Sequence, residues 1–391
     1  MSRFLEALLG RLPIGWLQLR HSRTRLIAAI AGVAFANLLV LMQLGFAFGL
    51  TESVRLSYEQ LNADIIVVAS DMNTLADGSP LPRQRMYEAL AVEGVAGATP
   101  LYFGKLDWKQ PNGTIRSLDL FGIEPSARPF RNAGIAAVQD MLTLSDHVIM
   151  DRRTRNVSKE VFERIEAGTP YRFEVKNRTL TVFGTFTIGG GFTTDGYMIA
   201  SDQTFLKLFP QRAAGAPNYI LLTLAPGADR AAVLSSLRAA LPAYDSSVYT
   251  IDEVIRRDQA FQTTQKPVGV VFGFGVIIGI MVGIIIVYQV LSTDVADHLR
   301  EYATFKAIGY PNRFFLSIVF EEAVVLGILG FVPGLILSLG LYALIVKITG
   351  LPIAMTGARA LSVFVGSVVM CALSGAIATR RLNRANPAEL F

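Results

Sequence analysis

Four long stretches of the chain are apolar and contain no charged residue. They are Leu26–Leu50, Pro267–Leu291, Ala323–Val346 and Ala360–Thr379. A helix needs about 20 apolar residues to cross the hydrocarbon core of a bilayer, so each stretch is long enough to span a membrane. The pattern predicts an integral membrane protein with four transmembrane helices. We place these helices at residues 26–50, 267–291, 314–346 and 360–379.

The distribution of basic residues predicts how the helices are oriented. The residues before the first stretch include Arg3, Arg11, Arg20, Arg23 and Arg25, and the last stretch is followed by Arg380, Arg381 and Arg384. Lys and Arg near the ends of spans favour the cytoplasmic side. We therefore expect segments 1–25, 292–313 and 380–391 in the cytoplasm, and segments 51–266 and 347–359 on the outer side. Arg256, Arg257 and Lys266 run against this rule, but long loops are translocated largely regardless of charge.

The N-terminal residues carry an apolar pattern of their own. Apolar residues recur at helical spacing before Pro13 and continue after it among arginines: Phe4, Leu5, Leu8, Leu9 and Leu12, then Trp16 and Leu19. This pattern predicts an amphipathic helix lying on the inner membrane surface. The alternative is a short helix that packs on the protein itself.

Small residues at four-residue spacing predict close contacts between helices. They are Gly275, Gly279 and Gly283 in the second span, and Ala28, Gly32 and Ala36 in the first. Such residues let two helix backbones approach each other. We expect both faces to form contacts within one chain or between two copies.

The third span contains features that are unusual for a membrane helix. Glu321 and Glu322 lie one or two turns inside it, and an acid at mid-bilayer costs about 2.5–3.5 kcal/mol on insertion scales. We expect both carboxyl groups to face the protein interior or the lipid headgroups. Gly330, Pro333 and Gly334 predict a kink.

Segment 51–266 alternates short strand-like and helix-like patterns. Strands are predicted at Ile65–Ala69, Gly97–Lys109, Thr114–Gly122, Tyr171–Val175, Thr179–Thr187, Tyr219–Leu224 and Ser247–Thr250, and helices at Arg83–Ala91 and Asp229–Leu241. The order predicts an α+β domain built from residues 51–124 and 218–266, with a subdomain inserted at 125–217. The triple glycine Gly189–Gly191 is interpreted as a flexible hairpin tip.

Composition and charge narrow the function classes. The chain is 52% hydrophobic and 17% charged, whereas soluble domains are about a quarter charged. The net charge of +5 comes with basic residues that flank the apolar stretches. We therefore expect membrane lipid, and no nucleic acid, as a partner.

The sequence offers little for catalysis or for metal binding. Cys371 is the only cysteine and is interpreted as a small buried hydrophobe. No Cys/His spacing suits a metal, and Ser145, Asp146 and His147 are adjacent in sequence, which is not how a catalytic triad is arranged. The chain contains no Gly-x4-Gly-Lys-Ser/Thr loop. We expect no catalytic, cofactor or metal site, and no ATP binding by this chain alone.

The inner loop, residues 292–313, is the most informative segment. Val295, Leu299, Tyr302, Phe305 and Ile308 give one apolar helical face, which ends at Gly309 and Pro311 as a capped helix should. Such a helix suits docking to a cytoplasmic partner. By pattern alone, an amphipathic connector on the membrane surface fits equally well.

Two motifs resemble a known family. The run from His298 to Tyr310, HLREYATFKAIGY, resembles the R-E-x-A/G-x-L-K-A-I-G-A/Y motif of the FtsX-like permeases, the MacB-type ABC transporters. The end of the chain, RANPAELF, resembles that family's R-x-x-P-x-E-x-L/F ending, and segments between Phe183 and Asp202 resemble the DevC-like branch. Tyr310 and Phe305 depart from the family pattern, in which Ala and Leu are common at these positions.

The resemblance implies a fold and a mechanism. The outer domain would comprise a porter-like part and an inserted subdomain. The inner-loop helix would be the coupling helix that seats on a separate cytoplasmic ABC ATPase, through Leu299, Arg300, Glu301, Tyr302, Phe305, Lys306, Ile308 and Gly309. The permease would be a homodimer in the bacterial inner membrane, and members of the DevC-like branch work with a HlyD-type membrane fusion protein and a TolC-type outer-membrane duct. ATP would be bound by the partner subunit.

Three functions share these features. The first is the permease subunit of a tripartite exporter, which the DevC-like segments favour. The second is a transmembrane signal transmitter that regulates a cell-wall hydrolase, and the third is a lipoprotein-releasing permease. The coupling helix is common to all three, so it does not separate them.

Overall fold

The computed structural model describes residues 14–110, 113–298, 301, 304–305 and 308–378. The chain divides into two compact units. We call the first, which contains residues up to Ala47, Val270–Ile345 and residues from Ile353 onward, the helical domain. The second, Phe48–Gly269 with Val346–Pro352, is the sheet domain.

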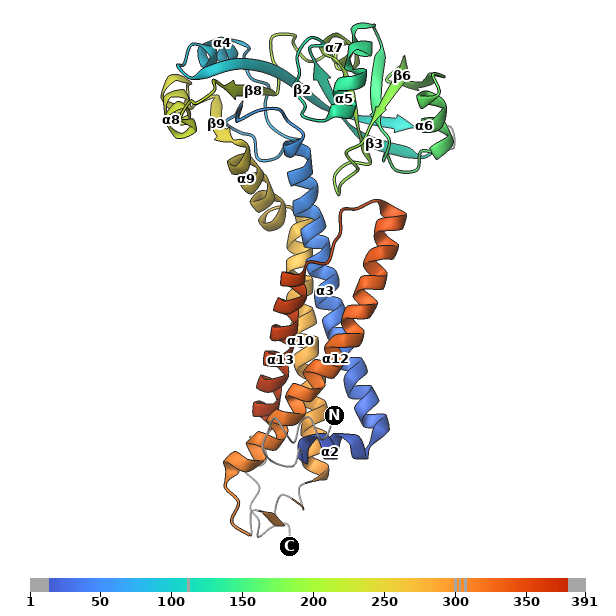
Figure 1. Ribbon diagram of the computed structural model, residues 1–391, viewed down its shortest axis with the longest axis vertical. Helices are drawn as coiled ribbons and strands as arrows, with labels where there is room; N and C mark the ends of the chain where they lie inside the picture. Colours follow the sequence, from blue (N-terminus) through green and yellow to red (C-terminus); the bar gives the residue numbers. More distant parts are fainter. Residues whose placement is uncertain (1–13, 111–112, 299–300, 302–303, 306–307, 379–391) are drawn as a thin grey trace. The chain divides into compact units, whose positions relative to one another are not determined.

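Long helices make up the helical domain (Figure 1). They are α3 (Arg23–Glu59), α10 (Pro267–Asp297), α12 (Asn312–Thr349) and α13 (Gly357–Ala378), preceded by the short α2 (Ile14–His21). Within the described residues, these four long helices are the ones with the length and hydropathy to cross a membrane. The prediction of four transmembrane helices is thereby confirmed.

The helix α3 is longer than the apolar stretch that predicted it. It continues into the sheet domain as far as Glu59, and its last nine residues, Thr51–Glu59, contain no Gly or Pro. Arg55 forms ion pairs with Glu52 and Glu59, one turn away on either side. Pairs at this spacing support a helix outside the apolar environment.

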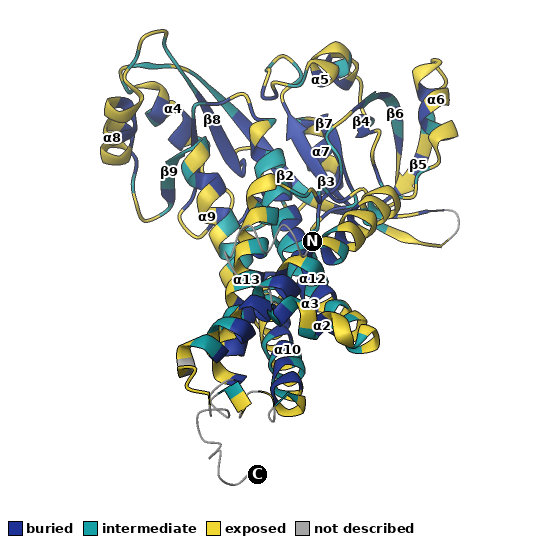
Figure 2. Cartoon of the chain, turned by 60° about the horizontal axis from the view of Figure 1, so that its bottom comes forward, coloured by how far each residue is buried: buried dark blue, intermediate teal, exposed yellow. Residues whose placement is uncertain are grey.

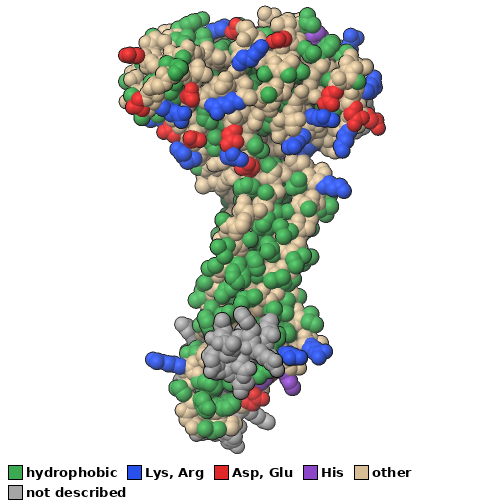
Figure 3. All heavy atoms as spheres, in the orientation of Figure 1, with side chains coloured by type: hydrophobic (Ala, Val, Ile, Leu, Met, Phe, Trp, Pro, Cys, Tyr) green, Lys and Arg blue, Asp and Glu red, His purple; other side chains and the backbone are tan. Residues whose placement is uncertain are grey.

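Apolar side chains cover the outside of the helical domain. On the face that Figure 3 shows, hydrophobic side chains dominate this domain, whereas charged side chains are spread over the sheet domain. Large side chains such as Val271, Ile278 and Ile336 are more than half exposed. A surface of this kind suits lipid tails, as expected for membrane-spanning helices.

The described part of the sheet domain contains one mixed sheet of nine strands. Its order is β5-β6-β4-β7-β3-β2-β8-β1-β9. The strands are β1 (Ile65–Ala69), β2 (Val95–Lys109), β3 (Ile115–Ile123), β4 (His147–Asp151), β5 (Tyr171–Val175), β6 (Arg178–Phe186), β7 (Gly196–Ser201), β8 (Tyr219–Leu224) and β9 (Ser246–Thr250). The pairs β3–β7 and β4–β6 are parallel and the others are antiparallel.

Short helices cover the sheet. They are α4 (Gln84–Leu90), α5 (Ala133–Val138), the 3-10 helix η1 (Gln139–Thr143), α6 (Lys159–Glu166), α7 (Asp202–Leu208), α8 (Arg230–Ala240) and α9 (Ile251–Thr264). Figure 2 shows buried strands between helices whose outer faces are exposed. The start of α9 is fixed by a capping box between Thr250 and Glu253, which satisfies two backbone amides that the helix leaves free.

The predicted α+β class is confirmed, and the predicted strands are present. The segment 125–217, which we predicted as an inserted subdomain, contributes β4–β7. These strands continue the same sheet, because β7 pairs in parallel with β3. The strands β4 and β7 were not predicted from the sequence.

The interpretation of the triple glycine as a hairpin tip is wrong. The strand β4 lies between β6 and β7, so Gly189–Gly191 belong to a crossover loop. This loop is held down: the Gly189 amide donates to the Asp151 carboxylate at 2.6 Å. A Cβ on Gly191 would lie 2.8 Å from the Cβ of Ser53 on α3. The glycines therefore allow close packing there.

Candidate functional site

The segment that connects α10 to α12 is described in part. Glu301 and Ile308 are exposed, and Phe305 is half-buried. Four of the predicted coupling residues lie outside the described residues: Leu299, Arg300, Tyr302 and Lys306. We call residues 301–310 the coupling segment.

A glycine cap ends the coupling segment. Gly309 has a φ of 104°, a left-handed conformation that glycine adopts without strain. The Tyr310 amide donates to the carbonyl of Phe305 at 3.1 Å, and the two rings meet edge to face with centroids 5.7 Å apart. This is the hydrogen bond and the apolar contact of a Schellman motif. The helix end that the sequence predicted at Gly309 is present.

Aromatic packing anchors the coupling segment to two helices. Phe305 and Phe314 are the partly buried aromatic members of a cluster that contains Phe315 and Ile318 of α12 and Ile14 of α2. Phe315 and Ile318 are fully buried. A displacement of Phe305 would therefore act directly on the start of α12 and on α2.

Buried acids lie close to this cluster. Glu321 is 6% exposed and Glu322 is fully buried, so both face the protein interior, one of the two expected environments. The Trp16 amide in the first turn of α2 donates to Glu321 at 3.2 Å. A Cβ on Gly15 would lie 2.9 Å from Cγ of Glu322. The short helix α2 thus packs directly on α12, which favours the alternative interpretation for Trp16 and Leu19, whereas Phe4, Leu5, Leu8, Leu9 and Leu12 lie outside the described residues.

An arginine joins α3 to the end of α10 beside these acids. Arg25 lies 3.5 Å from Asp294, whose side chain is 3% exposed, and it also pairs with Asp297. Asp294 in turn interacts with Glu322 on α12. The carboxyl groups of two helices and the guanidinium of a third therefore meet next to the coupling segment. A buried carboxylate needs a counter-charge or hydrogen bonds to stay inside a protein.

The predicted small-residue faces of α3 and α10 are in contact with each other. A Cβ on Gly279 would lie 2.9 Å from the Val40 side chain, and one on Gly283 would lie 3.1 Å from the Cβ of Ala36. Gly275 faces Gln43 and Gly32 faces Ile286 in the same way. Ala28 is exposed, so it takes no part in this contact within the chain.

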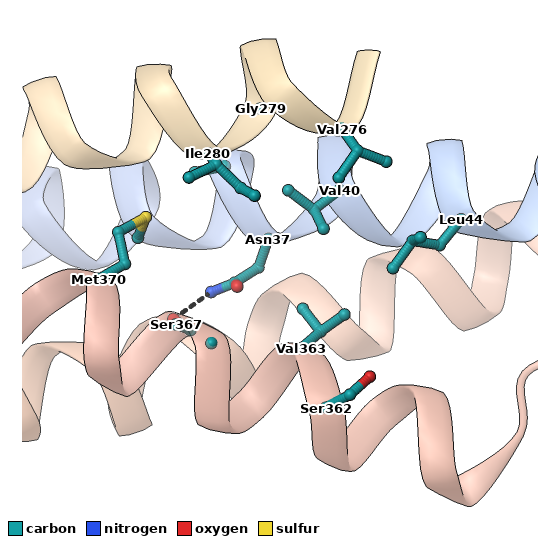
Figure 4. A pocket seen from close by; sticks show the side chains of 12 residues that line it. Asn37, Val40, Leu44, Val276, Gly279, Ile280, Ser362, Val363, Ser367 and Met370 are labelled. Carbon is teal, nitrogen blue, oxygen red and sulfur yellow. Dashed lines mark hydrogen bonds between the residues drawn. The ribbon is translucent and has the colours of Figure 1, made fainter. Parts of the chain in front are cut away.

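A cavity lies beside this helix contact (Figure 4). Its volume is about 230 Å³, and it is lined by α3, α10 and α13. None of its 12 lining residues is charged. The polar groups that face it include Asn37, whose amide donates to the Ser367 hydroxyl at 3.1 Å. Such a cavity can hold an apolar group with one hydrogen-bonding function.

Two family models match the chain. The model of the FtsX-like permease C-terminal region matches residues 273–387, which contain most of α10, the coupling segment, α12 and α13. The model of the MacB-like periplasmic core domain matches residues 26–240, more than half of the 391-residue chain. This chain belongs to the FtsX-like, MacB-type permease family. It is an ABC transporter permease, which works with an ATPase partner.

Curated relatives agree with the assignment. An uncharacterized ABC transporter permease from Mycobacterium tuberculosis strain H37Rv is 25% identical over 96% of this permease and 97% of the relative. The corresponding protein of strain CDC 1551 matches equally well.

Two solved structures also match, at low similarity. The periplasmic region of MacB from Actinobacillus actinomycetemcomitans has a TM-score of 0.35 and 12% identity, and covers 50% of the permease and 92% of that structure. The extracellular domain of YknZ, a noncanonic ABC-type transporter from Gram-positive bacteria, has a TM-score of 0.31 and 12% identity. The match covers 48% of the permease and 99% of that structure.

Sequence reasoning missed part of this site. Arg25 was counted only as an orientation signal, and Asp294 and Asn37 were not singled out. The available signals were an acid three residues beyond the apolar stretch that ends at Leu291 and an amide inside the first span. A polar residue at such a position in a membrane helix usually has a partner inside the protein.

Proposed function

We propose that this chain is the permease subunit of a MacB-like exporter. A separate cytoplasmic ATPase docks on the coupling segment, and its ATP-driven motion passes through the spans to the sheet domain on the periplasmic side of a bacterial inner membrane. Both termini are cytoplasmic in this proposal. The chain works as a homodimer, with a HlyD-type membrane fusion protein and a TolC-type outer-membrane duct.

The coupling segment carries this proposal. It is a capped helical turn between two membrane helices, with Glu301 exposed toward solvent and Phe305 packed into the aromatic cluster. An exposed charge suits a partner, and a half-buried aromatic anchor transmits force. The sequence contains no Gly-x4-Gly-Lys-Ser/Thr loop, so in this proposal the partner binds ATP and supplies the energy.

Contacts continue from the coupling segment through the helical domain. Phe305 contacts the start of α12, α12 contacts α2 through Glu321, and Arg25 of α3 holds the end of α10. The α3–α10 contact is close enough that the helices move together rather than slide. Rigid helices that move as a group suit transmission of motion.

Purification from native membranes tests the assembly. We expect a tagged chain, cross-linked before solubilisation, to co-purify with an ABC ATPase and a HlyD-type adaptor, and with a second, differently tagged copy of itself. Capture of the ATPase with a cell-wall hydrolase and without an adaptor would favour the signal transmitter. Capture of the ATPase with acylated lipoproteins would favour the lipoprotein-releasing permease.

Substitutions in the coupling segment test the docking role. We expect Glu301→Arg and Phe305→Asp to leave membrane insertion intact but to reduce the ATPase activity that depends on the complex by at least about tenfold. Phe305→Leu, which keeps an apolar anchor, should retain most of this activity.

Glu163→Arg, at an exposed acid on α6, is the matched control and should change nothing. Normal ATPase docking and normal export in the Glu301→Arg/Phe305→Asp double variant would refute the role of the segment.

A further inference from the structure

The cavity of the helical domain is lined by an amide group that is only partly used. Asn37 on α3 is 3% exposed, and its nitrogen donates one hydrogen bond to the Ser367 hydroxyl of α13. Figure 4 shows this bond, and shows no hydrogen bond to the amide oxygen. Among the described residues, Oδ1 of Asn37 has no hydrogen-bond partner, although buried polar atoms in native proteins nearly always have one. The amide therefore offers a free acceptor at the cavity.

The depth of Asn37 in the membrane decides what can use this acceptor. The residue lies next to the midpoint of the apolar stretch Leu26–Leu50. Water and lipid headgroups are then roughly 15 Å away, half the thickness of the hydrocarbon core. Lipid tails carry no hydrogen-bond donor. A molecule that satisfies Oδ1 must therefore bring its own donor into the hydrocarbon core.

Other polar side chains of the spans provide a comparison. The hydroxyl groups of Ser338 and Ser374 donate to carbonyl oxygens one turn earlier in their own helices, at 2.7 Å and 2.9 Å. Gln43 on α3 also has an amide oxygen without a partner among the described residues, but this side chain packs against Gly275 and does not line the cavity. Asn37 combines a free acceptor with a space that a ligand can occupy.

The walls of the cavity suit an apolar molecule larger than benzene. The volume is about 230 Å³, and none of the 12 lining residues is charged. An apolar protein cavity of about 150 Å³ holds benzene and stays free of water. The larger volume here leaves room for an aromatic ring with a hydroxyl group and a short alkyl chain. Water is a poor occupant because walls such as Val40, Leu44 and Val363 give it no hydrogen-bond partner.

The cavity opens on the surface that we assign to lipid. Of its lining residues, Ile280 on α10 is 42% exposed, and Ser362 and Gly366 on α13 are exposed. A Cβ added to Gly366 would have nothing within 4 Å, so no described atom closes the opening there. A molecule dissolved in the bilayer can therefore enter from the side, between α10 and α13.

We propose that this cavity binds one small apolar molecule with a hydroxyl donor, of the alkylphenol type, which enters from the lipid bilayer. The hydroxyl group donates to Oδ1 of Asn37, and the apolar body contacts α3, α10 and α13. In the low dielectric of the bilayer core, this hydrogen bond is stronger than in water. Because Gly279 also lines the cavity, the molecule touches the close contact between α3 and α10. The site rests on the helical domain alone, whichever partners the permease has.

Saturable binding of tritiated 4-propylphenol tests the site. The purified full chain is placed in dioleoylphosphatidylcholine nanodiscs, in which partition into lipid rises linearly with concentration and does not saturate. We expect one saturable site per chain. At equal mole fractions in the lipid, unlabelled 4-propylphenol should compete at least about fivefold better than 4-propyltoluene, in which a methyl group replaces the hydroxyl donor. Equal competition would show that the cavity takes any apolar group, such as a lipid tail, and would overturn the proposal.

Two substitutions separate the hydrogen bond from the space. Asn37→Leu removes the acceptor, so 4-propylphenol and 4-propyltoluene should then compete equally. Gly366→Leu places a side chain at the opening without a clash and should remove most of the saturable binding. Gly340→Leu is the matched control, because nothing lies within 4 Å of its added Cβ and it does not line the cavity. This control should bind as the unaltered chain does.

Size-exclusion chromatography and melting temperatures show whether each variant is folded. If Asn37→Leu does not fold, the preference of the unaltered chain for the phenol and the Gly366→Leu variant still test the site. An undiminished preference for the phenol in folded Asn37→Leu would overturn the proposal. So would a lack of saturable binding to the unaltered chain, the result expected if a second copy of the chain covers the opening.

Discussion

The helical domain and the sheet domain stabilise their buried acids in different ways. In the helical domain, Asp294 has Arg25 from a neighbouring helix, and Glu321 has the free amide of Trp16. In the sheet domain, Asp151 is held by three amides of nearby turns and loops. The difference follows from secondary structure: a long helix uses nearly all its amides internally, so a carboxyl group there needs a side chain or a helix start.

This difference indicates where each domain can change state. In the helical domain, the polar groups near the coupling segment connect separate helices, so a shift of one helix alters the partner of another. In the sheet domain, Asp119 on β3 and Asp258 on α9 each have one carboxyl oxygen without a hydrogen-bond partner among the described residues, so the binding of a proton alters their charge. The helical domain is therefore suited to respond to a movement of its helices, and the sheet domain to a change of pH.

The largest effect on assembly is expected from crowding the α3–α10 contact. Gly279→Leu would place side-chain atoms against Val40, which is already 2.9 Å from the position of an added Cβ. Overpacking costs about 1–3 kcal/mol and sometimes more, and four added carbons favour the upper end. We expect a large loss of correctly assembled protein, measured by size-exclusion chromatography in detergent.

A glycine on the same helix provides the matched control. Nothing lies within 4 Å of a Cβ added to Gly273, so Gly273→Leu should assemble normally. Normal assembly and activity of Gly279→Leu would show that α3 and α10 are not closely packed at Gly279.

The next effect concerns the pH dependence of the sheet domain. Because the folded pKa values of Asp119 and Asp258, about 7 and about 6, exceed the unfolded value near 3.9, both groups stabilise the fold most at low pH. This contribution is lost as pH rises through 6 to 7. We expect a loss on the order of 2–4 kcal/mol between pH 5 and 8. That loss corresponds to a fall in melting temperature of about 5–15 °C.

Tryptophan fluorescence can follow this transition in the sheet domain. The chain has two Trp residues, so Trp16→Phe leaves buried Trp108 as the reporter. The Asp119→Asn/Asp258→Asn variant should flatten the pH profile. Burial also raises the pKa of Asp151, so a smaller slope should remain. An unchanged slope in the double variant would contradict the assignment of these two groups.

The sequence predicted the helical domain more completely than the sheet domain. Membrane helices follow from local hydropathy, because lipid imposes one strong requirement on every residue, and the four spans were found with only their ends shifted. The short strands β4 and β7 were missed because their burial depends on pairing with β3 and β6, far away in sequence. Coupling-segment features that lie within one turn, such as the cap at Gly309, were predictable.

Pairings between helices were not predictable in the same way. The sequence could identify Glu321 and Glu322 as unusual, but not Trp16 and Asp294 as their neighbours. Likewise, nothing in the spacing of Asp119 and Asp258 indicates that both line one small cavity. Contacts of this kind depend on the tertiary fold, which brings together segments that local patterns treat as independent.

A moderate effect is expected from removing the counter-charge of Asp294. Arg25→Ala leaves this buried carboxylate beside Glu322, and breaking a buried pair costs about 3–5 kcal/mol. Because the Arg25 side chain is 34% exposed, solvent screening lowers the expected loss to about 1–2 kcal/mol. Thermal unfolding in detergent should show it, whereas Arg23→Ala, at an exposed position, should not. Equal stability of both variants would remove the proposed link between α3 and α10.

The smallest effect tests whether polar pairs differ in strength between the domains. The neutral pair Asn37–Ser367 lies among apolar side chains in the helical domain, at 3.1 Å. A double-mutant cycle with Asn37→Ala and Ser367→Ala should give a coupling energy of about 0.6 kcal/mol, as for other membrane helices.

The pair Tyr58–Asp258 in the sheet domain involves an ionisable group at 3.0 Å. A cycle with Tyr58→Phe and Asp258→Asn at pH 8 should give about 1.5–3 kcal/mol. If the two coupling energies were equal, the buried carboxyl group would gain nothing from its charge.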